Sequence, residues 1–377
     1  MSRTARLRSE AGYSLIELLV SSAIMITITG AIFNLVNPAQ GASQTTPEIS
    51  DIQQRARVTS DVLFRELMMS GAGTYQGPVT GSLVNFFAPI VPRRVGRTSP
   101  DAINVFRSDT ITLAYIPNTY SQTTISSAMP NVSAELKVTN QPNCPSGQEL
   151  CGFTEGMEVI IFDTSGNFDT FTITQVQDDA AHLQHHGQDL SYPYDVGASV
   201  TQVQRNTYYW CRPNSDRTCP GEETASQLRR YNGATTDVPL VDNVVGLTFE
   251  YSGDPNPPLQ PKPPLGVANC LYDSAGAYKN LPVLTADEGS LAVLTPAMLT
   301  DATGGDLCGA GSSQFDPDLL RVRKIKVTAR VQVAAAALRG ANTLLFRNPG
   351  GARESARQVP DYTVSFEVTP RNLNLTR

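Results

Sequence analysis

The sequence has little charge, few aromatic side chains and only three histidines, and these shortages narrow the classes of protein that it can encode. Charged residues make up 17% of the 377 residues and aromatic residues 7%, with a single tryptophan. A net charge of -6 argues against a large nucleic-acid surface, because phosphate binding requires clustered lysine and arginine. Low charge together with 28 glycines and 26 prolines favours a turn-rich β architecture over a helical bundle.

The short motifs that mark common catalytic sites are also missing. There is no G-x-S-x-G, P-loop or H-E-x-x-H motif, although a Ser–His–Asp site assembled in space stays open. His182, His185 and His186 cluster in DDAAHLQHHGQDL, where a strand and turn is the stronger interpretation and a metal site the weaker. DTSGNFD lacks the spaced acidic set of a calcium loop and is predicted to be a hairpin turn. We therefore expect no catalytic residue, metal ion or cofactor.

Cysteine is absent from the first 143 residues and then occurs six times, in loops rich in Pro, Gly and Asn. An even number of loop cysteines beyond a membrane segment predicts disulfides formed in an oxidising compartment. Zinc is the weaker alternative, because no C-x-x-C motif occurs. Six cysteines can pair in many ways. The short spacings favour two pairs and leave a third by elimination: Cys144–Cys151, Cys211–Cys219 and Cys270–Cys308.

Long apolar runs are absent except near the N-terminus. From Tyr13 to Val36 the only charged residue is Glu17, and at about 1.5 Å per residue this stretch can cross a bilayer as a helix. Three arginines and one Glu precede it, so the positive-inside rule predicts a cytoplasmic N-terminus and an exported globular part. A carboxylate in hydrocarbon is costly and usually functional. The plainer alternatives for Glu17 are an interfacial carboxylate or one stabilised by the helix dipole.

The stretch AGYSLIELLV, which follows a short basic leader, resembles the class III leader of type IV pilins and pseudopilins. In that family a prepilin peptidase cuts after a Gly, the new N-terminal residue is N-methylated, and a Glu stands fifth in the processed chain. The resemblance implies a leader over residues 1–12, cleavage between Gly12 and Tyr13, and methylation of Tyr13. It also implies that Glu17 pairs with the N-terminal ammonium of a neighbouring subunit, an attraction that a low dielectric strengthens.

A helical pattern continues beyond the apolar run. Asn37-Pro38 and Gly41 predict a kink or interruption, and Thr46 is a candidate cap for a new helical start. We expect a long helix over residues 13–73, with its transmembrane part at about 13–37. Apolar or small residues at steps of three and four predict one buried face on its second half: Ile49, Ile52, Ala56, Thr59, Leu63 and Leu67.

Beyond residue 74 the apolar period changes from helical to two. DTITLAYIP, GMEVIIFD, VVGLTFEY, KIKVTARVQV and YTVSFEV each predict a strand with one buried and one wet face. The predicted fold class is α+β, a long N-terminal helix packed on a mainly antiparallel β-sheet. Residues 74–377 are expected to form an exported β-rich globular domain. Within it, the Pro-rich and Cys-bearing segment 252–318 is predicted to be a large insertion between two neighbouring strands.

Several further fragments resemble the W-type (PilW-like) minor pilins: ARVTSDVLFRELMMSGAG, LVDNVVGLTFEYSG, RVRKIKVTARVQ and VTPRNLNL. In that family a helix ending near an Ala-Gly signal precedes a β-rich domain that closes with an Arg-Asn-Leu tail. Here Met68-Met69-Ser70 replaces the commoner Leu-Arg-Gln. The resemblance implies a pilin-like fold and a non-catalytic minor subunit of the type IV pilus, in a priming complex near the tip. Its implied partners are other minor pilins, the major pilin, prepilin peptidase and the inner-membrane assembly platform.

These inferences place the chain in the bacterial inner membrane, with a periplasmic globular domain that later reaches the pilus and cell surface. One alternative is the J-type pseudopilin of a type II secretion system, which the size of the chain disfavours. Another is an inner-membrane-anchored periplasmic enzyme or binding module with an accidental leader match.

Two smaller features have structural interpretations. The basic patch RRVGR, with Arg93, Arg94 and Arg97, is predicted to be a solvated loop rather than a contact for nucleic acid, given the acidic balance of the chain. Trp210 stands beside Cys211 and is expected to pack against a disulfide or the core.

Overall fold

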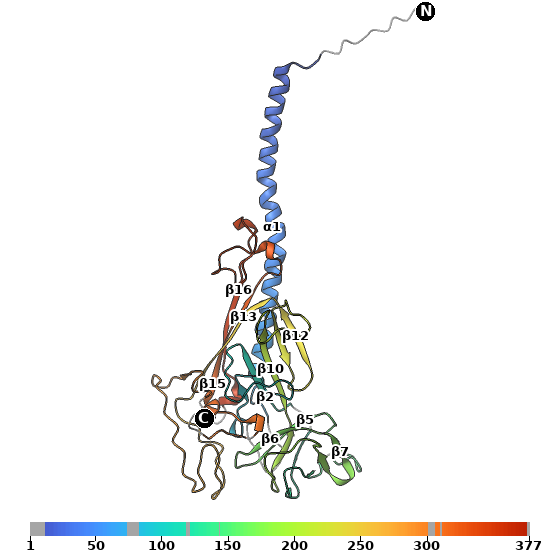
Figure 1. Cartoon of the computed structure of the whole chain (residues 1–377), viewed down its shortest axis with the longest axis vertical. Helices are drawn as coiled ribbons and strands as arrows, with labels where there is room; N and C mark the ends of the chain where they lie inside the picture. Colours follow the sequence, from blue (N-terminus) through green and yellow to red (C-terminus); the bar gives the residue numbers. More distant parts are fainter. Residues whose placement is uncertain are drawn as a thin grey trace, which may run out of the picture. The chain divides into compact units, whose positions relative to one another are not determined.

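The computed structural model describes residues 12–73, 83–117, 121–142, 144–300, 306–309 and 311–374. The fold is α+β: one long helix, α1 (Leu15–Met69), precedes short strands that form antiparallel sheets (Figure 1). The chain divides into two compact units, Met1–Gln53 with Val333–Asp361 and Gln54–Gln332 with Tyr362–Arg377. The division therefore lies within α1 rather than at the end of the helix.

The helix α1 runs without a break for 55 residues, so the interruption expected at Asn37-Pro38 and Gly41 does not occur (Figure 1). An internal proline removes one backbone hydrogen bond, and the long helical segments on either side tolerate that loss. Thr46 is not a cap either. Its hydroxyl donates to the carbonyl of Ala42 at 2.7 Å, which satisfies the side chain inside the helix.

The second half of α1 buries one face. The predicted stripe is confirmed except at Ile49, which is 41% exposed. After Met69 the chain leaves the helix through Gly71, which has a left-handed φ of 69°. The N–H of Gly71 donates to the carbonyl of Ala114 at 2.9 Å, so the end of the helix is tied to a strand. The buried positions recur at three or four residues: Ile52, Ala56, Thr59, Leu63 and Leu67.

The largest sheet has five strands in the order β1-β2-β10-β11-β12. Strand β2 was predicted to have one solvent-exposed face, and this prediction is wrong, because every residue of β2 is buried. Tyr208 and Trp210 of β10 face the main core, and Tyr209 and Cys211 face a separate small cluster, so both faces are covered. The strands are β1 (Ile90–Val91), β2 (Thr110–Tyr115), β10 (Gln204–Cys211), β11 (Gln227–Tyr231) and β12 (Asp237–Asp242).

A second sheet has the order β14-β13-β15-β16 and packs into the same core as Leu63 and Leu67 of α1. Its two long strands confirm the predicted alternation, with buried Phe249 opposite buried Val327. The rings of Phe64 and Phe366 lie 6.3 Å apart, which joins α1 to the edge strand. The strands are β13 (Val244–Gly253), β14 (Ala292–Leu294), β15 (Val322–Val331) and β16 (Tyr362–Val368).

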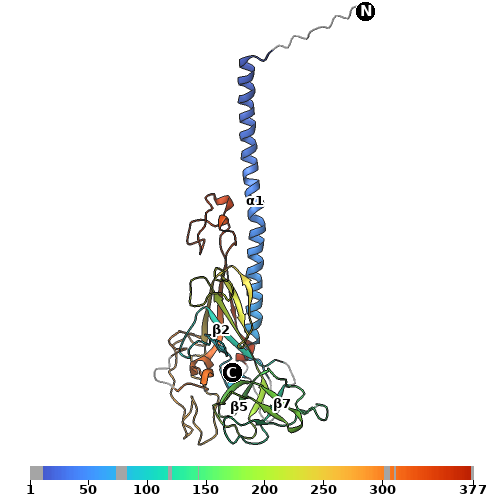
Figure 2. The ribbon, with the colours of Figure 1, turned by 45° about the vertical axis from the view of Figure 1, so that its right-hand side comes forward.

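Two smaller sheets enclose a second core, so the single predicted sheet is in fact four sheets (Figure 2). Strand β5 serves both cores: Ile160 packs into the main one and Val159 into the second. The orders are β3-β9-β5-β6 and β4-β8-β7. The bounds are β3 (Gln122–Thr124), β4 (Leu136–Lys137), β5 (Glu158–Phe162), β6 (Phe168–Thr172), β7 (Gln175–Gln177), β8 (His182–Gln184) and β9 (Ser199–Gln202).

Short 3-10 helices join several of these strands. They are Leu83–Asn85, Asp178–Ala180, Gly311–Ser313, Pro317–Arg321, Ala336–Leu338, Ser355–Arg357 and Arg371–Asn374.

Residues 254–321 form a long connection between the paired strands β13 and β15. Its short strand β14 pairs with β13 on the edge opposite β15. At its end, the fully buried guanidinium of Arg321 donates to the carbonyls of Pro255 at 2.9 Å and Pro282 at 2.7 Å. Arg321 also forms an ion pair with Asp318 at 2.5 Å, which compensates its buried charge.

Candidate functional site at the start of the long helix

Ser14 and Glu17 cap the N-terminus of α1. The backbone N–H of Ser14 donates to Oε2 of Glu17 at 3.0 Å, and the Ser14 hydroxyl accepts from the N–H of Ile16 at 3.4 Å. This arrangement is a variant of the capping box, in which a Ser or Thr is followed three residues later by Glu; here the hydroxyl accepts from Ile16 instead of from Glu17. The pattern is visible in the sequence as Ser14-Leu15-Ile16-Glu17, a signal that the sequence-based expectations did not include.

The residues just before the cap are open to solvent. Tyr13 is 91% exposed, and a Cβ placed on Gly12 would meet no atom within 4 Å. Residues 1–11 of the expected leader lie outside the described residues. The peptide bond between Gly12 and Tyr13, where the leader resemblance places cleavage, is therefore not shielded by the described part of the chain.

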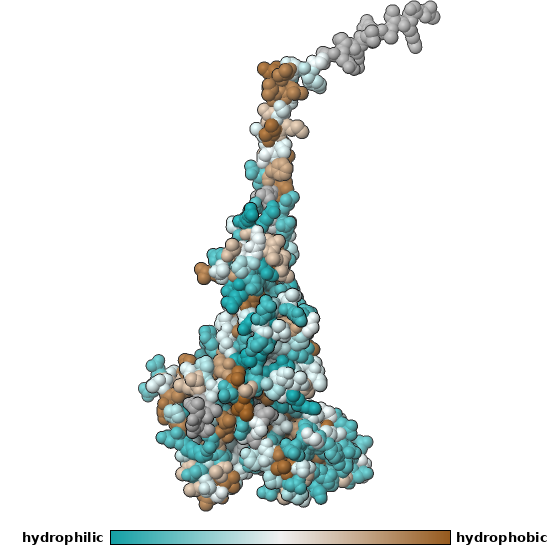
Figure 3. Space-filling view, in the orientation of Figure 1, coloured by the Kyte–Doolittle hydropathy of each residue, from teal (hydrophilic) through white to brown (hydrophobic). Residues whose placement is uncertain are grey.

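The large apolar side chains in the first half of α1 are exposed, and Figure 3 shows brown, apolar side chains along the face in view. Every large apolar residue from Leu15 to Val36 is at least 40% exposed. Soluble monomers seldom expose so large a contiguous apolar surface. By length and composition, α1 is a candidate membrane span, and its most apolar window is 0% buried within the protein.

Ser21, Ser22 and Thr27 inside this span hydrogen-bond to carbonyls of the preceding helical turn. The Ser22 hydroxyl donates to the carbonyl of Leu18 at 2.8 Å, and the Thr27 hydroxyl donates to that of Ile24 at 2.8 Å. Such back-bonding lowers the cost of placing hydroxyls in hydrocarbon. The only charged side chain of the span is that of Glu17, which lies in the first turn of α1, at the positive end of the helix dipole.

The three histidines are close in sequence but serve different partners. His185 is 4% exposed, with Nδ1 at 2.5 Å from the carbonyl oxygen of Gln188 and Nε2 at 2.8 Å from that of Ala134. Nδ1 of His182, in β8, lies 3.1 Å from the carboxylate of Glu135. Among the described residues, no three His, Cys, Asp or Glu side chains gather where they could hold a metal ion.

The segment DTSGN is a hairpin turn between β5 and β6, as predicted. One carboxylate oxygen of Asp163 accepts from the N–H groups of Ser165 at 2.8 Å and Asn167 at 3.0 Å. The other accepts from the Asn167 amide at 2.9 Å. Asp163 thus stabilises the turn, because it replaces backbone partners that the turn leaves unpaired.

The RRVGR segment is not the solvated loop that the sequence predicted. Arg93 is 3% exposed and donates to the carbonyls of Gln314 at 2.5 Å and Ala102 at 3.3 Å. Burial lowers the pKa of its guanidinium to about 10, against the opposing effect of nearby Asp101. Arg94 lies over the Tyr231 ring at 3.9 Å, so two of the three arginines are structural.

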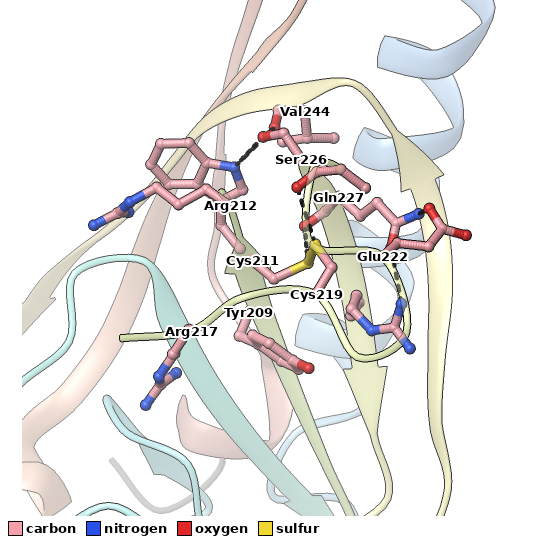
Figure 4. The surroundings of a disulfide bond; sticks show 12 residues. Tyr209, Cys211, Arg212, Arg217, Cys219, Glu222, Ser226, Gln227 and Val244 are labelled. Carbon is pink, nitrogen blue, oxygen red and sulfur yellow. Dashed lines mark hydrogen bonds between the residues drawn. A yellow bond between two sulfur atoms is a disulfide. The ribbon is translucent and has the colours of Figure 1, made fainter. Parts of the chain in front are cut away.

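All six cysteines are paired, and the three disulfides are those that the spacings favoured: Cys144–Cys151, Cys211–Cys219 and Cys270–Cys308. Around the second of these, the side-chain amide of Gln227 donates to Glu222 at 3.1 Å (Figure 4). Trp210 lies on the opposite face of β10 from Cys211, and its Nε1 donates to the carbonyl of Val244 at 2.8 Å. Of the two positions expected for it, Trp210 therefore occupies the core.

An ion network holds the disulfide loop of residues 211–219 to the largest sheet. Arg217 forms an ion pair with Asp101 and donates to Oγ1 of Thr110 at 2.6 Å. Although desolvation raises it, the pKa of Asp101 is net lowered by hydrogen bonds from Arg217 and Arg94 and by the charges of Arg217 and Arg107. The network joins segments distant in sequence, so no local signal could have revealed it.

Comparison with known proteins identifies no relative, since no protein family, curated protein or solved structure matches the chain.

Proposed function

We propose that this chain is a minor subunit of a type IV pilus, of the W-type, made as a precursor and anchored in the inner membrane by the first half of α1. The observation that carries the proposal is the order of features at the start of α1. An exposed Gly12–Tyr13 bond precedes an exposed apolar helix whose single charge is Glu17. A leader peptidase would cut the exposed bond, a membrane would hold the apolar helix, and the polymer core would use the charge of Glu17.

The cap geometry supports a specific role for Glu17. Its carboxylate binds the N–H of Ser14, one residue from the amine that cleavage before Tyr13 would create. A carboxylate and an ammonium in lipid are each costly, and each gains most by approaching the other. During assembly, Glu17 would exchange a neutral N–H partner for the ammonium of a neighbouring subunit, and charge-assisted hydrogen bonds are the stronger kind.

The remaining parts would serve assembly without catalysis. The first half of α1 supplies the helical core of the polymer, and the β-rich domain supplies surfaces for other minor pilins and the major pilin. Prepilin peptidase and the inner-membrane assembly platform would act on the anchored form. Co-purification with minor pilins of a pilus is expected, and co-purification with pseudopilins of a secretion system would contradict the assignment.

The processing step is tested by determining the N-terminus of the membrane-bound protein. We expect a chain that begins with methylated Tyr13. Loss of residues 1–12 removes three arginines and one glutamate, which changes the net charge to -6 - 2 = -8. An intact Met1, or a cut beyond residue 37, would refute the proposal.

The role of Glu17 is tested by separating its charge from its hydrogen bond. Glu17→Ala should still insert into the membrane while its incorporation into filaments falls. Glu17→Gln keeps an oxygen that can accept from Ser14 but loses the charge, and we expect it to behave like Glu17→Ala. If the Glu17→Gln variant is incorporated as well as the native chain, Glu17 acts only as a helix cap. Ser14→Ala is the matched control, because it weakens the cap and leaves the charge.

A further inference from the structure

The segment Val333–Asp361, here called the 333–361 excursion, leaves the sheet between β15 and β16 and shares a compact unit with the first 53 residues. Two of its apolar residues are buried: Phe346 is 0% exposed and Val359 is 1% exposed. Arg339 donates to the carbonyls of Val333 at 2.9 Å and Ala334 at 2.7 Å, which closes the base of the excursion. These contacts hold the excursion in a defined conformation, so its exposed side chains form a defined surface.

That surface combines exposed leucine with unpaired positive charge. Leu344 is 85% exposed and Leu345 is 44% exposed. Arg347 and Arg353 are exposed, and neither has an ion-pair partner among the described residues. The excursion contains four arginines against Glu354 and Asp361, a net charge of 4 - 2 = +2 in a chain of net charge -6.

The excursion lies close to the end of the proposed membrane span. Every described residue of α1 from Leu15 to Val36 is exposed, and the first buried one is Gly41. Among the described residues of α1 in their shared unit, burial therefore begins only after Val36. Gly41 lies five helical steps after Val36, a rise of about 8 Å that is similar to the depth of one headgroup layer. Figures 1 and 2 both show the excursion beside α1.

We propose that the 333–361 excursion rests on the membrane that α1 spans, with Leu344 among the lipids and Arg347 and Arg353 against anionic phosphate headgroups. The inference rests on the proposed anchoring by α1. An apolar side chain flanked by arginines is the composition of interfacial membrane contacts. Two leucines offer far less apolar area than the roughly 800 Å² that each partner buries in a specific protein interface. The surface therefore suits anionic lipid better than a protein.

The test places an environment-sensitive fluorophore on the tip of the excursion. The full chain carrying Leu344→Cys would be labelled and reconstituted in phosphatidylcholine vesicles with or without phosphatidylglycerol. All six native cysteines are disulfide-bonded, so the added thiol is labelled selectively. Leu265→Cys, at a leucine that is 88% exposed, is the matched control. We expect a blue shift and quenching by nitroxide lipids at position 344 only, larger with the anionic lipid.

Charge reversal sharpens the test. An arginine near an anionic surface contributes about fivefold to binding, so Arg347→Glu with Arg353→Glu should abolish the dependence on phosphatidylglycerol. Added salt should weaken the contact of the unmodified excursion in the same direction.

Three outcomes would overturn the proposal. A Leu344→Cys label as water-exposed as the Leu265→Cys label, in a chain that resists alkaline extraction, refutes the excursion contact and leaves the anchoring intact. A chain extracted by alkali refutes the anchoring itself. Shielding that rises with the protein-to-lipid ratio and resists lipid quenchers would show that a second copy covers the tip.

Discussion

The two halves of α1 share one continuous backbone and differ completely in burial. Between Leu15 and Val36 every described residue is exposed, whereas from Ile52 to Leu67 about one residue per turn is buried. The second half is amphipathic and is stabilised by the sheets of its own chain. The first half is rich in exposed apolar side chains, which can gain that stabilisation only from lipid or from other helices. The two halves of α1 therefore differ in the surroundings that would stabilise them.

The largest effect is expected from an acidic residue placed in each half. Leu63→Asp buries an unpaired carboxylate at a 0% exposed site and should prevent the β-rich part from folding. Leu19→Asp, at a 59% exposed site, should leave that fold intact but disfavour membrane insertion, by at most the roughly 2.5–3.5 kcal/mol that Asp costs at the centre of a membrane helix. Circular dichroism and alkaline extraction report the two effects separately. Equal unfolding by both variants would remove the distinction between the halves.

The next effect concerns the connection of residues 254–321, which packs into the same core as the second half of α1. Cys270–Cys308 closes a loop of 38 residues, and Cys144–Cys151 closes one of 7. The loop-entropy relation assigns them about 4 and about 2.4 kcal/mol of unfolding free energy, respectively. The double serine variant at 270 and 308 should therefore lower stability more in urea unfolding than the one at 144 and 151. A reversed order would show that contacts such as those of Arg321, rather than the crosslink, hold the connection.

A smaller, pH-dependent effect is expected at Asp101. Although desolvation raises it, the pKa of this carboxyl is net lowered in the folded chain by Arg217, Arg94 and Arg107. Because the unfolded pKa is about 3.9, ionised Asp101 stabilises the fold above that pH, and this stabilisation is lost as the pH falls through the folded pKa. The stability difference between the native chain and Asp101→Asn should thus shrink in acid. A difference that stays constant from pH 7 to 2 would exclude this linkage.

The smallest effect is expected at the start of the first half. Ser14→Ala removes one side of the capping box and should destabilise the first turn of α1 by about 1 kcal/mol. Since nothing in the β-rich part depends on this turn, urea unfolding of that part should not change. Amide exchange at residues 15–18, in detergent, measures the local effect. A global loss of stability would mean that the halves of α1 are coupled.

Local patterns predicted much of the fold. Alternation marked β13 and β15, the step of three and four marked the buried face of α1, and short spacing favoured Cys144–Cys151 and Cys211–Cys219. These signals are local because helix and strand geometry repeats within a few residues. The cap formed by Ser14 and Glu17 was not predicted, although its S-x-x-E spacing is an equally local signal that could have revealed it.

Other features needed the tertiary structure. Whether β2 has one covered face or two depends on clusters drawn from distant segments, and the burial of Arg93 depends on a carbonyl 221 residues away. The path of α1 through Pro38 and the pairing of the 333–361 excursion with the first 53 residues are likewise decided by context.

By itself, the sequence determined that a long N-terminal helix precedes strands, where the exposed apolar half of that helix lies, and that Glu17 is the only charge in that half. Only the tertiary structure decided which faces are covered and which arginines are internal. The physical reason is range: periodicity is a property of neighbouring residues, whereas burial depends on segments that meet only when the chain has folded.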